Sequence, residues 1–155
     1  MSLQKEIKQR KPFASLEQEV VLNVMRTAGS LRQGTSELLK PFDLSAPQYN
    51  VLRILRGAGD EGLPCSEVGD RLVTRDPDVT RLLDRLEKRG LIERGRSSKD
   101  RRVVTATITK KGIELVNELD TPVTDLHAEQ LGHMKKKEMK KLVALLEKLR
   151  GDEEP

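Results

Sequence analysis

Apolar side chains recur at helical spacing from residue 16 to residue 31, which predicts a long first helix. Ser15 can cap its start, with Gln18 three residues further on. Gly34 interrupts the stripe, and the stretch 40–43 ends it. Because the stripe is wide, we expect this helix to bury more than one side. Its apolar residues are Leu16, Val20, Val21, Val24, Met25, Ala28 and Leu31.

A second amphipathic helix is predicted after Ser45, whose side chain can cap it, with residues 46–47 in the first turn. It ends in the glycine-rich stretch 57–62. A short third helix is expected to run through Val68 and Leu72.

The stretch 57–62 spells G-x-G-x-x-G, the pattern of a dinucleotide-binding loop. That loop requires a strand before it and a helix after it, so that backbone amides can approach the pyrophosphate. Here the pattern follows an amphipathic helix and leads into residues 63–64. We interpret it as a helix end followed by a turn.

The segment 75–90 predicts a helix with one cationic face. Asp76 before Pro77 is a strong helix start, because the carboxylate caps free amides and proline loses no hydrogen bond there. Thr74 is a rival cap. The inward positions are Val79, Leu82, Leu83 and Leu86, and the outward ones are Asp78, Arg81, Arg85 and Lys88. With the short helix before it, this segment describes a helix-turn-helix.

The period then changes, and two stretches rich in β-branched residues, 91–94 and 103–108, predict a β-hairpin with a loop over 95–102. The loop tip holds four cations, two serines and one aspartate. Taken alone it is also explained as an exposed polar turn, but beside a helix-turn-helix such a ribbon is a wing. Arginines at its tip can enter a narrow minor groove. Asp100, two residues before Arg102, can orient one guanidinium by a bidentate pair while a neighbouring arginine reaches the DNA.

Two helices are expected to close the chain. The first begins at Thr109, and Pro122 bends or restarts it; the second covers 139–149. The first and last helices carry more apolar surface than one small core requires, which predicts a dimer. The expected interface residues are Leu16, Val20, Leu142, Leu145, Leu146 and Leu149.

Charge is distributed unevenly along the 155 residues, whose formal net charge is +4. Residues 71–112 hold thirteen basic and six acidic side chains, a balance of +7, while the rest of the chain is at −3. A solvated surface also explains this charge, but its arrangement on one helix and one hairpin favours a polyanion-binding module.

The sequence gives little support to other classes of protein. Aromatic residues make up 2% of the chain, too few for stacking single-stranded bases. The lone cysteine, Cys65, gives no zinc or disulfide pattern. His127 and His133 are six positions apart, a spacing that would put them on different faces of one helix. We therefore expect no metal and no cofactor. Neither a membrane span nor a leader peptide is evident, and no catalytic motif appears. We expect a cytoplasmic protein that is not an enzyme.

The chain resembles the MarR family of winged-helix transcription regulators. The resemblance rests on 44–49 (LSAPQY), 51–52 (VL), 79–94 (VTRLLDRLEKRGLIER), 100–102 (DRR) and 109–112 (TKKG). It implies a homodimer whose terminal helices form the interface and whose two winged lobes bind a pseudo-palindromic operator on double-stranded DNA. It also implies repression of nearby genes in a bacterial or archaeal cell, often relieved by a small-molecule effector.

Carried over by position, the helix 76–89 is the recognition helix in the major groove, Arg102 is the minor-groove arginine of the wing, and Asp100 is the acid that positions it. The expected DNA-binding residues are Arg75, Asp76, Asp78, Thr80, Arg81, Arg85, Arg96, Ser98, Lys99, Asp100, Arg101 and Arg102. Arg81 is placed to read guanine, and Lys99 to contact phosphate. One position departs from the family, which usually has Ser or Thr where this chain has Arg75.

The predicted fold is therefore mainly α with a small β-hairpin wing. We expect an N-terminal dimerisation helix in 1–40, a winged helix-turn-helix in 41–112 and C-terminal dimerisation helices in 113–155. The alternative function is a winged helix that docks proteins without binding specific DNA, and the acids Asp76 and Asp78 lend it some support.

Overall fold

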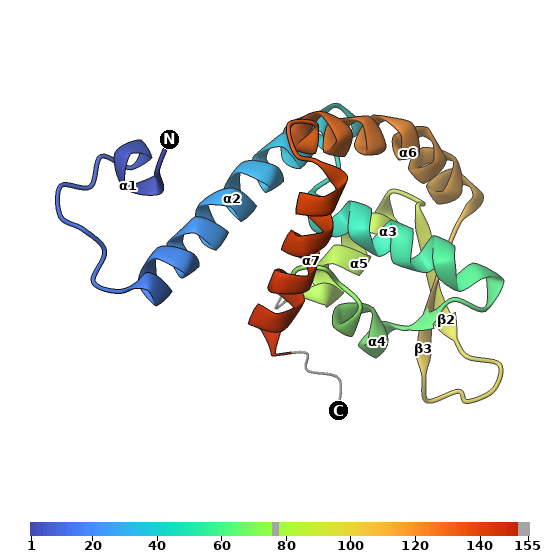
Figure 1. Cartoon of the computed structure of the whole chain (residues 1–155). Helices are drawn as coiled ribbons and strands as arrows, with labels where there is room; N and C mark the ends of the chain where they lie inside the picture. Colours follow the sequence, from blue (N-terminus) through green and yellow to red (C-terminus); the bar gives the residue numbers. More distant parts are fainter. Residues whose placement is uncertain (76–77, 152–155) are drawn as a thin grey trace.

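The computed structural model describes residues 1–75 and 78–151, which form a mainly helical fold with a small antiparallel sheet (Figure 1). The helices are α1 (Leu3–Glu6), α2 (Leu16–Leu39), α3 (Ala46–Ala58), α4 (Cys65–Asp70), α5 (Val79–Lys88), α6 (Lys110–Leu131) and α7 (Lys136–Arg150). Two 3₁₀ turns, η1 (Lys40–Phe42) and η2 (Gly59–Glu61), follow α2 and α3. The strands are β1 (Leu63–Pro64), β2 (Ile92–Arg96) and β3 (Val104–Ile108). The predicted mainly helical fold with a β-hairpin is confirmed.

Side chains cap α2, α3 and α6 at the starts that the sequence predicts. The hydroxyl of Ser15 accepts a hydrogen bond from the amide of Gln18 (3.2 Å) at the start of α2. Ser45 and Gln48 form a reciprocal capping box on α3, and Thr109 caps α6. Each cap satisfies an amide that has no partner within its helix.

The interruption expected at Gly34 is wrong, and of the two outcomes expected at Pro122, a bend or a restart, the restart is wrong. α2 continues through Gly34, where a side chain would meet Nε2 of Gln130 from α6, so this glycine permits close helix packing instead of ending the helix. α6 likewise continues through Pro122. Its neighbours Leu119 and Val123 are buried, and the buried apolar face outweighs the hydrogen bond that proline removes.

The core lies inside the winged lobe. Its largest fully buried side chains are Leu39, Val51, Leu52, Leu55, Val68, Leu83, Leu86, Leu91, Ile92, Val116 and Leu119. They come from α3, α4, α5, the wing and the ends of α2 and α6 that face them, so one core fixes α5 relative to the wing.

The sheet has the order β1-β3-β2. In the hairpin Ile92 pairs with Ile108 and Arg96 with Val104, and Leu63 of β1 pairs with Ala106 on the other side of β3. The G-x-G-x-x-G stretch is a helix end and a turn, as predicted, and Gly62 there has a φ of +65°. The turn feeds directly into β1, a strand that the sequence did not predict.

The terminal helices leave much apolar surface uncovered. Leu39 is the only residue of α2 that is buried, and α7 buries none. The first half of α2 extends beyond the winged lobe (Figure 1). Leu16 is 72% exposed, and Leu145 and Leu149 are each 54% exposed. Within the described residues, none of the helices has the length and apolar character that crossing a bilayer requires.

Candidate nucleic-acid interface

α5 begins later than the sequence predicts. It starts at Val79, and its cap is Asp78, whose Oδ1 accepts a hydrogen bond from the amide of Arg81 (3.0 Å). Asp78 is therefore the cap and not an interior residue of the helix expected over 76–89, while Asp76 and Pro77 lie outside the described residues. Two aspartates fit the capping pattern, and spacing alone does not choose between them.

The two faces of α5 are as predicted. Leu82, Leu83 and Leu86 are buried, and Val79 packs against the core. The predicted DNA-binding residues other than Asp76 are all exposed: Arg75, Asp78, Thr80, Arg81, Arg85, Arg96, Ser98, Lys99, Asp100, Arg101 and Arg102. They lie on α5, on the turn before it and on the hairpin loop, so one lobe presents both a helix and a loop to solvent.

Contacts to neighbouring elements hold the turn before α5 and the end of α5. Asn50 of α3 accepts a hydrogen bond from the amide of Val73 in the turn (2.8 Å). At the other end, the guanidinium of Arg89 donates to the carbonyls of Phe42 and Asp43, which follow α2. Sequence reasoning missed both contacts, because they join residues more than twenty positions apart.

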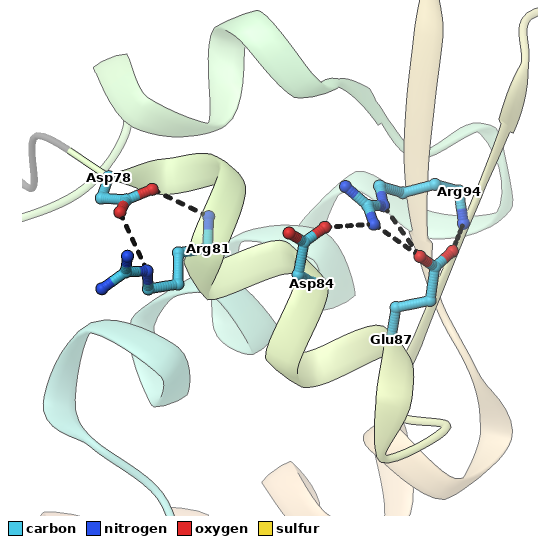
Figure 2. Close-up of polar contacts among 5 residues, drawn as sticks. All are labelled: Asp78, Arg81, Asp84, Glu87 and Arg94. Carbon is cyan, nitrogen blue, oxygen red and sulfur yellow. Dashed lines mark hydrogen bonds and ion pairs between the residues drawn. The ribbon is translucent and has the colours of Figure 1, made fainter.

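A charged cluster joins α5 to the wing, and Figure 2 shows the three residues that form it. The guanidinium of Arg94 on β2 lies 2.6 Å from Glu87 and 2.6 Å from Asp84, both on α5. The amide of Arg94 also donates to Glu87 (3.0 Å). These hydrogen bonds lower the pKa of Glu87 and raise that of Arg94. Because Arg94 is bonded by side chain and backbone, the direction of the wing depends on that of α5.

The wing loop is ordered by hydrogen bonds of its own. The guanidinium of Arg96 donates to the carbonyl of Arg101 (3.0 Å), and the hydroxyl of Ser97 accepts from the amide of Lys99 (3.2 Å). Asp100 accepts a hydrogen bond from the backbone amide of Arg102 (2.9 Å). In the described structure Asp100 therefore holds the backbone of Arg102, and its predicted role in positioning the Arg102 side chain stays a prediction.

The winged lobe is also fixed to the last part of the chain. Arg56 of α3 makes two hydrogen bonds to Asp120 of α6 (2.8 and 2.9 Å) and a third to Asn117 (2.7 Å). Arg56 thereby lowers the pKa of Asp120.

Burial raises the pKa of Cys65, which favours the neutral thiol over a reactive thiolate. Among the described residues, no group of three His, Cys, Asp or Glu side chains is arranged to hold a metal ion.

A helix-turn-helix followed by a β-hairpin, both with cationic exposed faces, defines the winged-helix class of proteins. Within this class, the MarR family model matches residues 42–103. The HTH-type transcriptional regulator MhqR of Bacillus subtilis is 32% identical over 105 residues, which cover 68% of this chain and 70% of that protein.

Solved structures show the same likeness. The MarR transcription factor from Planctomyces limnophilus is 41% identical, with a TM-score of 0.67, covering 88% of this chain and 98% of that one. A mutant MarR from Escherichia coli, complexed with operator DNA, is 27% identical, with a TM-score of 0.77, covering 88% and 99%. The chain belongs to the MarR family of transcriptional regulators, and it is not an enzyme.

Proposed function

We propose that this protein is a homodimeric repressor that binds a pseudo-palindromic operator in double-stranded DNA. In this proposal residues 41–112 form the DNA-binding domain, and residues 1–40 and 113–155 form the dimerisation region. α5 is the recognition helix in the major groove, and the wing loop around Arg102 enters the minor groove.

The observation that carries DNA binding is the joint exposure of α5 and the wing loop on a segment of charge +7. Arg81 and Arg85 are on the exposed face of α5, and Arg96, Arg101 and Arg102 are on or beside the loop. The Arg94 cluster keeps the helix and the loop in one orientation. Two rigidly joined cationic projections suit two adjacent grooves of a duplex.

Dimerisation is supported by the apolar side chains that α2 and α7 leave exposed. Leu16, Val20, Leu142, Leu145 and Leu149 are each between 40% and 72% exposed in the single chain. Leu146 is partly buried beside them. A second copy that covers these side chains removes a large apolar area from water, which stabilises the dimer. Sedimentation of the full chain at low concentration is expected to give twice the 17.5 kDa mass of one chain.

A small-molecule effector also fits the proposal. A cleft of about 530 Å³ lies between the end of α2, the start of α3 and the end of α5. Its charged lining residues are Lys40, Asp43, Arg85, Lys88 and Arg89. This excess of cations suits a small anion. Because Arg85 lines the cleft and is also a proposed DNA contact, an anion bound there competes with DNA for this side chain and weakens DNA binding.

The proposed function is tested by a salt titration of binding to two duplexes, one from the DNA upstream of this gene and one of random sequence. A DNA-binding repressor loses affinity steeply as salt rises, because contacts to phosphates release counterions. It also retains an excess of affinity for the upstream duplex at every salt concentration. A protein-docking module shows neither behaviour.

A further inference from the structure

One carboxylate at the start of α5 makes two contacts with the same residue. Oδ1 of Asp78 accepts a hydrogen bond from the amide of Arg81 (3.0 Å), which caps the helix. Oδ2 lies 3.2 Å from Nε of the Arg81 side chain (Figure 2). The second contact is not needed for capping, and it acts on the side chain that is predicted to read a guanine.

The geometry of a guanidinium gives this contact a consequence. Arginine has five N–H donors in a planar fork, one on Nε and four on the two Nη atoms. A carboxylate on Nε leaves the Nη atoms available, and Figure 2 shows them pointing away from the α5 ribbon. Recognition of guanine uses two donors, directed at O6 and N7. Asp78 thus engages one edge of the guanidinium and leaves the other for a base.

We propose that Asp78 positions Arg81 for guanine, and so sets the sequence preference of the recognition helix. This inference rests on the proposed DNA-binding function. This role explains why an acid stands at the start of a helix that is proposed to face DNA, although its negative charge repels phosphate. The acid lowers affinity for all DNA and raises discrimination at one base pair.

The exposure of the pair agrees with a role in orientation and not in folding. The side chains of Arg81 and Asp78 are 70% and 49% exposed. An ion pair this exposed to solvent contributes little to the stability of the fold. In a groove, water is displaced and the attraction between the two charges strengthens. A preset guanidinium also loses less side-chain freedom on binding than an unrestrained one.

The test separates capping from positioning with Asp78→Asn. Asparagine caps helices about as well as aspartate, so α5 is retained, but its amide carries no charge to hold the guanidinium. Duplexes are first selected from a random pool by the unmodified protein. Arg81→Ala then identifies the guanine that Arg81 reads, as the position where preference is lost.

We expect Asp78→Asn to reduce the preference for that guanine by at least about threefold, as expected when a bidentate contact is weakened. Affinity for random duplex rises at the same time, because an acid near phosphate is gone. The matched control is Asp70→Asn at the exposed end of α4. It removes the same charge without touching Arg81, and it leaves the guanine preference unchanged.

Three results overturn the inference. If Asp78→Asn keeps the full guanine preference, Asp78 only caps the helix. If it changes preference at a base that Arg81→Ala leaves unaffected, Asp78 reads that base itself. If the unmodified protein selects no sequence from the pool, the proposed function fails and this inference fails with it; the first two results leave the proposed function standing.

Discussion

The guanidinium of Arg94 lies 2.6 Å from the carboxylate of Glu87, so the first strand of the wing is hydrogen-bonded to the last turn of α5. Asp84, one turn earlier on α5, binds the same guanidinium. Only 23% of the Arg94 side chain is exposed, which limits competition from water. The helix and the wing therefore behave as one rigid unit toward any partner.

Removing the guanidinium should weaken this unit. Arg94→Ala is expected to lower the free energy of unfolding by about 1–3 kcal/mol, because Glu87 and Asp84 lose their partner and repel each other. Arg94→Lys restores the charge but not the planar fork, so it should recover part of the loss. Urea denaturation measures both variants.

Arg101→Ala is the matched control, because it removes an exposed arginine from the wing without touching α5. Its free energy of unfolding should stay within about 0.5 kcal/mol of the unmodified protein. If Arg94→Ala is as stable as this control, the claim that Arg94 couples α5 to the wing is wrong.

Acid should destabilise the fold through two carboxylates whose pKa values arginine hydrogen bonds lower, Glu87 and Asp120. Hydrogen bonds from Arg94 lower the pKa of Glu87, and hydrogen bonds from Arg56 lower that of Asp120. A lowered folded-state pKa adds stability above the unfolded-state pKa, and that stability is lost as the pH falls through the folded-state value. The free energy of unfolding should therefore decline below about pH 4. A Glu87→Gln, Asp120→Asn double variant should decline less steeply, and parallel curves would contradict the assignment.

Gly62 should not tolerate a side chain. Its φ is +65°, and a Cβ there would collide with the carbonyl oxygen of Ala106 on β3. Gly62→Ala is expected to cost at least about 2 kcal/mol of unfolding free energy, from the left-handed backbone and the displaced strand.

Gly57→Ala gives the contrast, since Gly57 lies in α3 with nothing within 4 Å of a Cβ, and alanine favours helix by about 0.5–1 kcal/mol. Relative to the unmodified protein, Gly62→Ala should lower the melting temperature and Gly57→Ala should raise it.

The reach of sequence reasoning can be judged residue by residue. The sequence identifies Ser15 and Ser45 as caps and Thr109 as a helix start, because a capping side chain acts on an amide only three residues away. The start of α5 was misplaced because Asp76 and Asp78 satisfy the same local pattern. β1 was missed because two residues carry no periodicity, and its strand character comes from pairing with β3.

In the candidate site, too, local sequence patterns predict some features, and tertiary packing determines the others. Its exposed cations follow from the spacing on α5 and from the composition of the loop. The Arg94 cluster depends on how α5 packs against β2, and no local pattern encodes that distance. The contact of Asp100 with the Arg102 amide likewise depends on the loop conformation.

Arg102 should contribute to DNA binding and not to the fold. Its side chain is exposed, and Asp100 holds its backbone. Arg102→Ala is expected to reduce affinity for a selected duplex by about tenfold or more, because a cation leaves the minor groove. Lys137→Ala on α7 removes an equal charge away from the wing and should have little effect. Gel-shift titration compares them, and a variant of Arg102 with unchanged affinity would remove the wing from the interface.

Footprinting of a bound, selected duplex tests the central claim most directly. A dimer with two winged lobes should protect two similar half-sites of opposite orientation, with centres about 10 base pairs apart or a whole-turn multiple of that distance. Protection of a single half-site, or of two unrelated sequences, would contradict a homodimer on a pseudo-palindromic operator.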